Sequence, residues 1–165
     1  MEDCYKFSFF SAPVQNTVPS FAFSILDAYR YISEPFAKER TKQLRAIASQ
    51  DEARRFKAQN FDYCTFSGLF KSRSSSQLIQ HSGLICLDFD HVDDIPALKR
   101  LLLEHEYFDT ILLFTSPSGN GVKWIVDVNL QGWEHSNFFK SMANCLKATG
   151  VPRRCAPWRA QSPTS

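Results

Sequence analysis

Residues 83–128, GLICLDFDHVDDIPALKRLLLEHEYFDTILLFTSPSGNGVKWIVDV, decide the fold of this 165-residue chain. Continuous apolar runs at 84–89 and 110–115 predict two buried strands. The loop at 116–121 and an apolar stretch at 122–128 predict a turn and a third strand. We expect a strand–helix–strand unit followed by a hairpin, and therefore an α+β fold with a mixed β-sheet and packed helices.

The residues between the first two strands predict a helix over 93–106. Asp93 or Asp94 is placed to cap it, and Pro96 falls in its first turn. Its apolar positions recur at helical spacing, which indicates one buried face.

Outside this segment, the patterns predict strands at 5–10 and 61–70 and a helix at 133–148. Residues 21–57 are expected to form two helices that are broken near Pro35. The second of them carries seven bases and three acids with few apolar positions, so we expect a surface helix that covers the fold rather than a nucleic-acid contact.

The composition indicates one domain, at 1–150, with an atypical basic tail at 151–165. The chain is 44% hydrophobic and contains fifteen Phe, enough for one core. No apolar run approaches the roughly 20 residues that span a bilayer, and the N-terminus lacks the order of a secretory signal, so we expect a cytoplasmic protein without membrane contact. Five scattered cysteines without a CxxC pair argue against a disulfide framework and a zinc ribbon.

Two aspartates, Asp88 and Asp90, stand at the end of the apolar strand at 84–90. Residues two apart in a strand share a face, so their carboxylates are neighbours and repel unless a cation lies between them. Mg²⁺ or Mn²⁺, held by one or two carboxylates and substrate phosphates, suits this geometry. The alternative is that the nearby acids only favour the start of the next helix, which leaves Asp88 among apolar neighbours unexplained.

A glycine- and serine-rich connection, Ser116 to Lys123, is the second candidate site. Its backbone N–H groups and the Lys123 ammonium suit a phosphate, although a plain hairpin turn also uses Gly-Asn-Gly. Adjacent parallel strands would place Asp90 and Ser116 at one edge of the sheet, facing one cleft. The phosphate-binding candidates are Ser116, Ser118, Gly119, Gly121, Lys123 and, from the loop after 61–70, Arg73.

The order FSGLFKSR, HSGLICLDFDH and LLFTSPSGNGVK resembles the VirE N-terminal-like domain of bacterial mobile-element proteins, grouped with the primase-polymerase superfamily. The resemblance covers about residues 1–150. It implies an RRM-like primase palm in which Asp88 and Asp90 are catalytic and bind divalent metal, and it aligns the Ser-x-His nucleotide element with Ser118–Lys123. Its implied partners are a nucleoside triphosphate, nucleic acid, or both, with DNA favoured and a role in mobile-element DNA replication.

The chain departs from that pattern at two positions. Lys123 stands where many primases carry histidine, and a lysine lacks the acceptor of a neutral imidazole. The third metal-binding acid has no clear match, and Asp127 is the one substitute on a strand.

Whether the chain is an enzyme is therefore open. If active, it would be a metal-dependent nucleotidyltransferase; the missing acid favours a degenerate, non-catalytic module that binds nucleic acid or a partner. A third hypothesis is a haloacid-dehalogenase-like phosphohydrolase with Asp88 as nucleophile and Asp90 as general acid/base. The shortage of acids after Gly121 counts against it.

Overall fold

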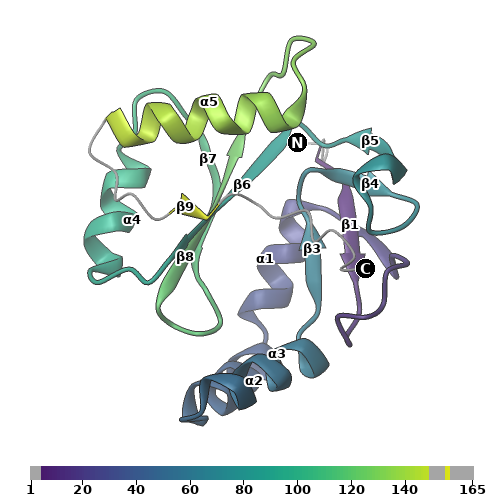
Figure 1. Ribbon diagram of the computed structural model, residues 1–165, viewed down its shortest axis with the longest axis vertical. Helices are drawn as coiled ribbons and strands as arrows, with labels where there is room; N and C mark the ends of the chain where they lie inside the picture. The colour runs from purple at the N-terminus through teal and green to yellow at the C-terminus, as the bar shows by residue number, and fades with distance from the viewer. Residues whose placement is uncertain (1–4, 149–154, 157–165) are drawn as a thin grey trace. The chain divides into compact units, whose positions relative to one another are not determined.

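The computed structural model describes residues 5–148 and 155–156 (Figure 1). Contacts divide the described chain into two compact units. Unit 1 contains residues 5–82 and Pro117–Gly119, and unit 2 contains Gly83–Ser116 with residues 120–148 and 155–156. The single domain expected over 1–150 stays a prediction, because two compact units can fold as one domain. Apart from Cys155–Ala156, the tail predicted at 151–165 lies outside the described residues.

Unit 2 is a four-stranded antiparallel sheet with two helices. Its strands lie in the order β7-β8-β6-β9, and all its pairings are antiparallel. Along the chain the elements are β6 (Leu84–Asp90), α4 (Ile95–Leu103), β7 (Thr110–Thr115), β8 (Gly121–Asp127), α5 (His135–Ala148) and β9 (Cys155–Ala156). This is the β-α-β-β-α-β order of ferredoxin-like and RRM-like domains.

The predicted α+β class with helices packed on a sheet is confirmed. The expected direct parallel pairing of β6 with β7 is wrong, because β8 lies between them and pairs antiparallel with both. The three strands and the helix between the first two were predicted correctly from residues 83–128. Asp94 caps α4 by accepting from the backbone N–H of Ala97 at 2.8 Å, as expected of one of the two aspartates.

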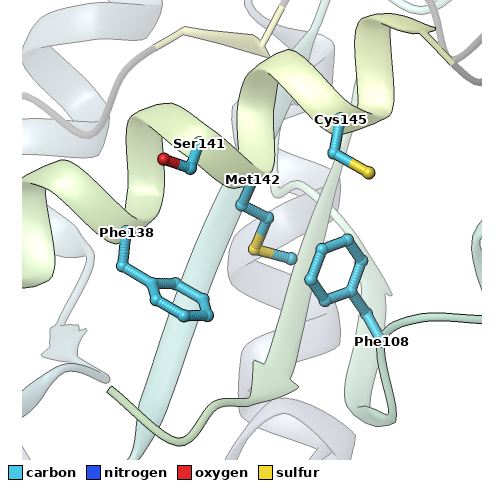
Figure 2. Close-up of a pocket in the computed structure, with 5 residues that line it drawn as sticks. All are labelled: Phe108, Phe138, Ser141, Met142 and Cys145. Carbon is cyan, nitrogen blue, oxygen red and sulfur yellow. The ribbon is translucent and has the colours of Figure 1, made fainter. Parts of the chain in front are cut away.

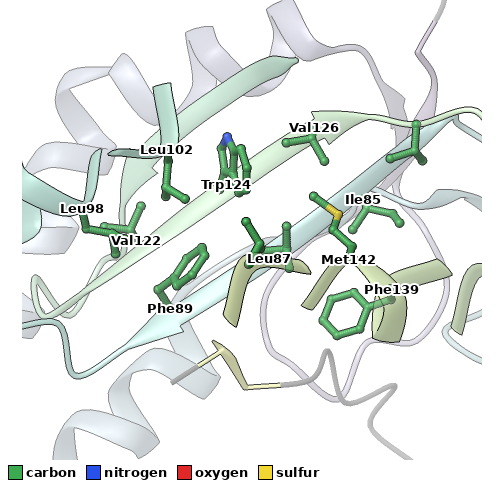
Figure 3. Packing of buried hydrophobic residues seen from close by; sticks show 12 residues of the cluster. Ile85, Leu87, Phe89, Leu98, Leu102, Val122, Trp124, Val126, Phe139 and Met142 are labelled. Atoms are coloured by element: carbon green, nitrogen blue, oxygen red, sulfur yellow. The ribbon is translucent and has the colours of Figure 1, made fainter. Parts of the chain in front are cut away.

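The core of unit 2 lies between the sheet and its two helices (Figure 3). Alternate residues of β6 and β8 face α4 and α5, and Trp124 is completely buried among them. The Trp124 indole N–H donates to Thr110 Oγ1 at 2.7 Å, which satisfies its polar atom. The cluster comprises Ile85, Leu87, Phe89, Leu98, Leu102, Val122, Trp124, Val126, Val128, Phe139, Met142 and Leu146.

The other residues of β6 and β8 point to the opposite face of the sheet. Because side chains alternate along a strand, the packing of Leu87 and Phe89 on the helices places Asp88 and Asp90 on that second face. The core packing therefore sets which residues can form a polar site.

Unit 1 is built on a short sheet of order β2-β1-β3 and a two-stranded sheet of β4 and β5. The buried Ser8 links them, because its Oγ accepts from the backbone N–H of Phe70 at 2.9 Å. Its elements are β1 (Phe7–Phe10), β2 (Phe21–Phe23), α1 (Ile25–Ser33), α2 (Pro35–Ala46), α3 (Gln50–Asn60), β3 (Tyr63–Thr65), β4 (Gly68–Phe70), η1 (Ser75–Gln77) and β5 (Leu78–His81).

Local predictions in unit 1 were less accurate. Residues 21–57 begin with a strand and contain three helices instead of two, although the break at Pro35 is confirmed. The single strand expected at 61–70 is two strands separated by a turn, and the strand at 78–81 was not predicted. These strands have three or four residues each, too few for alternation to be recognised.

No helix in the described part of the chain combines the length and the apolar character needed to cross a bilayer.

Candidate functional site

The candidate site lies on the second face of the unit 2 sheet, where β6 and β8 run side by side. Their antiparallel register sets Lys123 opposite Asp88 and Gly121 opposite Asp90. The Lys123 ammonium donates to Asp88 Oδ1 and forms an ion pair with it. The two side chains are 27% and 33% exposed, so the pair is partly shielded from water yet accessible.

Lys123 keeps its proton in this setting. Burial lowers the pKa of Lys123, but the negative charge of Asp88, which also accepts a hydrogen bond from the ammonium, outweighs that effect and holds the pKa above its ordinary value. Asp90 acts in the same direction from further along the strand. The site therefore holds a permanent cation at neutral pH.

Cys86 shares this face and is a neutral thiol. Burial raises the pKa of Cys86 to about 12. A thiol with that pKa is protonated at neutral pH and is a poor nucleophile there.

The ends of β6, β7 and β8 meet at Gly121. A Cβ added there would lie 2.5 Å from the Phe89 carbonyl oxygen, 3.1 Å from Ser116 Oγ and 3.4 Å from Asp90 Oδ1. Glycine is required because the backbone of β6 passes so closely. The Ser116 backbone N–H donates to the Gly121 carbonyl at 2.8 Å, which closes the loop.

Asp90 and Ser116 therefore do meet at one edge of the sheet, as predicted. The reason differs from the expected one. β6 and β7 run in the same direction and end at the same edge, but the start of β8 lies between them. Gly121 is the residue that brings the Asp90 carboxylate and the Ser116 hydroxyl together.

Asp127 lies far from these residues. It pairs with Leu84 at the opposite end of β6, four positions along β8 from Lys123. At about 3.3 Å per residue this is a separation of about 13 Å along the strand. The structure does not bring Asp127 to the aspartates with which it was predicted to bind metal.

The remaining candidates belong to unit 1. Ser118 and Gly119 group with that unit, although Ser116 and Gly121 on either side belong to unit 2. Arg73 is also in unit 1, where its guanidinium lies over the Tyr63 ring at 5.0 Å. This cation–π contact is a structural role that the sequence did not indicate.

The site offers a limited set of metal ligands. Among the described residues, no group of three or more His, Cys, Asp or Glu side chains is placed to hold a metal ion. Asp88 and Asp90 are the two carboxylates at this end of the face, because Asp127 lies at the other end of β8, and Lys123 already binds one of them. Two carboxylates fit a single Mg²⁺ that takes its other ligands from water and phosphate; they do not complete a two-metal centre.

A small apolar pocket in unit 2 is a separate feature (Figure 2). It has a volume of about 190 Å³ and is lined by Phe108, Phe138, Ser141, Met142 and Cys145. The Ser141 hydroxyl donates to the Asn137 carbonyl at 3.1 Å, so its proton is already used in a hydrogen bond within α5. No charged side chain lines this pocket.

Comparison with protein families matches residues 55–149 to the family described as BT4734-like, N-terminal domain. The match covers more than half of the chain and includes all of β6, β7 and β8. No curated protein and no solved structure matches the chain. The resemblance to the VirE N-terminal-like domain and the primase-polymerase superfamily is overturned by this match, so the residue roles that it implied lose that support.

Proposed function

This chain belongs to the BT4734-like, N-terminal domain family, and we propose that the β6–β8 face of unit 2 binds the phosphates of a nucleoside triphosphate together with one divalent cation. The observation that supports this proposal is that the Lys123 ammonium and the carboxylates of Asp88 and Asp90 lie together on adjacent strands, next to the glycine-containing loop before β8. Phosphate bound with Mg²⁺ needs both kinds of group, a cation for the phosphate and anions for the metal.

The charges of the three side chains favour binding of a divalent cation and a phosphate together over binding of either ligand alone. Asp88, Asp90 and Lys123 together carry one net negative charge at neutral pH. A phosphate by itself would be repelled by this site. A divalent cation reverses the sign of the net charge and makes the site attractive to phosphate, so we expect cation and nucleotide to bind cooperatively.

The ion pair defines the free state of the proposed site. Lys123 and Asp88 neutralise each other until the ligands enter. On binding, Asp88 would contact the cation and Lys123 the phosphate, each exchanging one charged partner for another. Asp90 and the Ser116 hydroxyl, which meet at Gly121, would supply the next contacts.

The metal supplies Lewis-acid polarisation of a phosphoryl oxygen when it is bound. What this chain's residues provide is binding and orientation, and we propose no reaction beyond that. The phosphohydrolase hypothesis gains nothing from the structure, because no third acid joins Asp88 and Asp90 in a metal-binding group among the described residues.

Isothermal calorimetry of Mn²⁺ binding, with and without a non-hydrolysable nucleoside triphosphate, tests the proposal. The wild type should bind Mn²⁺ more tightly when nucleotide is present. Asp88→Asn should lose Mn²⁺ binding, and Lys123→Met should lose the tightening by nucleotide.

Asp127→Asn is the matched control, since it removes one carboxylate from the far end of the same strand. It should behave as the wild type. Equal weakening by Asp127→Asn and Asp88→Asn would refute the proposed site. Nucleotide binding that is independent of metal would instead support a binding module without a cation.

A further inference from the structure

Phe114, on β7, lies beside the proposed nucleotide site. Its register partner on β8 is Lys123, and Lys123 in turn faces Asp88 on β6. An aromatic ring, an ammonium and a carboxylate therefore stand in one row across three adjacent strands. Neighbouring strands are about 4.8 Å apart, so Phe114 and Asp88 are separated by about 10 Å.

Phe114 points to the same face of the sheet as the ion pair. The preceding residue, Leu113, packs against the core that lies between the sheet and its helices. Because side chains alternate along a strand, Phe114 faces the other way. Phe114 does not belong to the core cluster of the described residues, and its side chain is partly exposed.

The Phe114 ring is not engaged by another aromatic or cationic group. Within the described part of the chain it makes no ring contact and no cation–π contact. The Lys123 ammonium donates to Asp88, on the side away from Phe114. β7 is the outermost strand of the described sheet, so Phe114 has a neighbouring strand on one side only. The exposed part of the ring is therefore accessible to a ligand.

The adjoining row of the same face is apolar. Two residues before Phe114, Leu112 faces Ile125, which in turn faces Cys86. Ile125 is completely buried. The aromatic and charged groups thus stand together towards one end of the face, with an apolar boundary beside them.

A nucleotide requires the two kinds of group that the row of Phe114, Lys123 and Asp88 provides. Its phosphates suit the ammonium and a cation held by carboxylates. Its base has an aromatic face that stacks on an aromatic side chain. The ribose and the α-phosphate separate the base from the β- and γ-phosphates, so an extended nucleotide can reach from Phe114 to Asp88. An inorganic polyphosphate would use only the charged part of the row.

We propose that Phe114 is the side chain on which the base of the bound nucleotide stacks. This inference rests on the proposed function and extends the site from the phosphates to the base. Every base has a π-face, so stacking accepts all bases and favours the larger purines over pyrimidines. Phe114 then selects nucleotides over inorganic polyphosphates. In the sequence, Phe114 was only one residue of an apolar run that predicts a buried strand.

Calorimetry in the presence of Mn²⁺ tests the proposal with three ligands: a non-hydrolysable analogue of adenosine triphosphate, the corresponding uridine analogue and inorganic tripolyphosphate. The test variant is Phe114→Leu, which keeps an apolar side chain but removes the ring. Phe114→Tyr keeps the ring and is the rescue variant. The matched control is Tyr107→Leu, which removes an exposed aromatic side chain from the connection between α4 and β7. Circular dichroism establishes that each variant is folded.

Loss of one base–aromatic stack weakens binding by about 5- to 150-fold. We expect a loss in that range for the adenosine analogue in Phe114→Leu, together with loss of the preference for the adenosine over the uridine analogue. Tripolyphosphate should bind Phe114→Leu as it binds the wild type. Phe114→Tyr and Tyr107→Leu should bind all three ligands with wild-type affinity.

Three results would overturn the stacking role while leaving the phosphate site in place. They are equal losses for the adenosine analogue and tripolyphosphate in Phe114→Leu, no loss for either ligand in that variant, and a loss of nucleotide binding in Phe114→Tyr as large as in Phe114→Leu. A wild type that binds neither nucleotide nor tripolyphosphate with Mn²⁺ would instead refute the proposed function, and the stacking role with it. Tripolyphosphate therefore distinguishes the two failures.

Discussion

Replacing Lys123 by Met removes the cation that pairs with Asp88 on the neighbouring strand. Opposite charges that face each other across two strands contribute up to about 1 kcal/mol, and exposed ion pairs contribute about the same at most. The side chains of Lys123 and Asp88 are only 27% and 33% exposed, and the variant leaves the partly buried Asp88 carboxylate without its partner. We therefore expect a loss of about 1–2 kcal/mol in the free energy of unfolding.

For a chain of this length, 1 kcal/mol corresponds to a shift of about 2–4 °C in Tm. Lys123→Met should thus lower Tm by about 2–8 °C. Asp88→Asn in the Lys123→Met background should recover part of the loss, because the unpaired carboxylate is then removed. The coupling energy of this double-mutant cycle should be about 1 kcal/mol.

Urea unfolding followed by tryptophan fluorescence measures all four proteins, since Trp124 is buried in the same sheet. The pH dependence gives a second readout. Because the pKa of Lys123 is raised in the folded state, its contribution is complete below the unfolded value of about 10.4 and is lost as pH rises through the folded value. The coupling should be constant from pH 6 to 9 and fall only when the pH rises above about 10.4.

Additive effects of the two substitutions, with a coupling below about 0.3 kcal/mol, would refute the reasoning. They would show that the two charges do not stabilise each other in solution. The proposed nucleotide site without ligands could then no longer be described as a Lys123–Asp88 ion pair.

Three further predictions concern single residues. Gly121→Ala should abolish nucleotide binding in calorimetry and lower the free energy of unfolding in urea by about 1–3 kcal/mol, because the added Cβ would lie 2.5 Å from the Phe89 carbonyl oxygen. Wild-type behaviour would contradict the close approach of the β6 backbone to Gly121. Ser8→Ala should destabilise unit 1 by about 1–3 kcal/mol in thermal unfolding, since it leaves the buried N–H of Phe70 without an acceptor; a change below about 0.5 kcal/mol would count against that bond. The raised pKa of Cys86 predicts that the free energy of unfolding falls between about pH 8.5 and 12. It also predicts that Cys86 in the folded protein is alkylated at pH 8 at least about 100-fold more slowly than in urea, as measured by mass mapping. Similar alkylation rates in the two states would show that the thiol is accessible and ionised.

The sequence by itself determined five elements of unit 2, namely β6, α4, β7, β8 and α5, and did not indicate β9. The apolar run of β6 is long enough to identify a buried strand, and Asp94 with Pro96 is a strong local signal for the start of α4. Alternation also assigned Asp88 and Asp90 to one face of the strand, which the packing of Leu87 and Phe89 on the helices explains. All of these inferences depend on residues close to one another in the chain.

The short strands of unit 1 were beyond such inference. β5 has four residues, three of them exposed, so neither burial nor periodicity marks it as a strand. Its existence depends on its pairing with β4, as β4 depends on the buried Ser8 of β1. Pairing between segments that lie far apart in the chain leaves no local pattern.

Only the tertiary structure decided what the site residues contact. The insertion of β8 between β6 and β7 set the register that pairs Lys123 with Asp88 across 35 positions of sequence. The same register carried Asp127 to the opposite end of the sheet, away from the other two aspartates. Alternation tells which face a side chain occupies, but the position along that face follows from strand order and register, and these are set by long-range packing of the whole sheet.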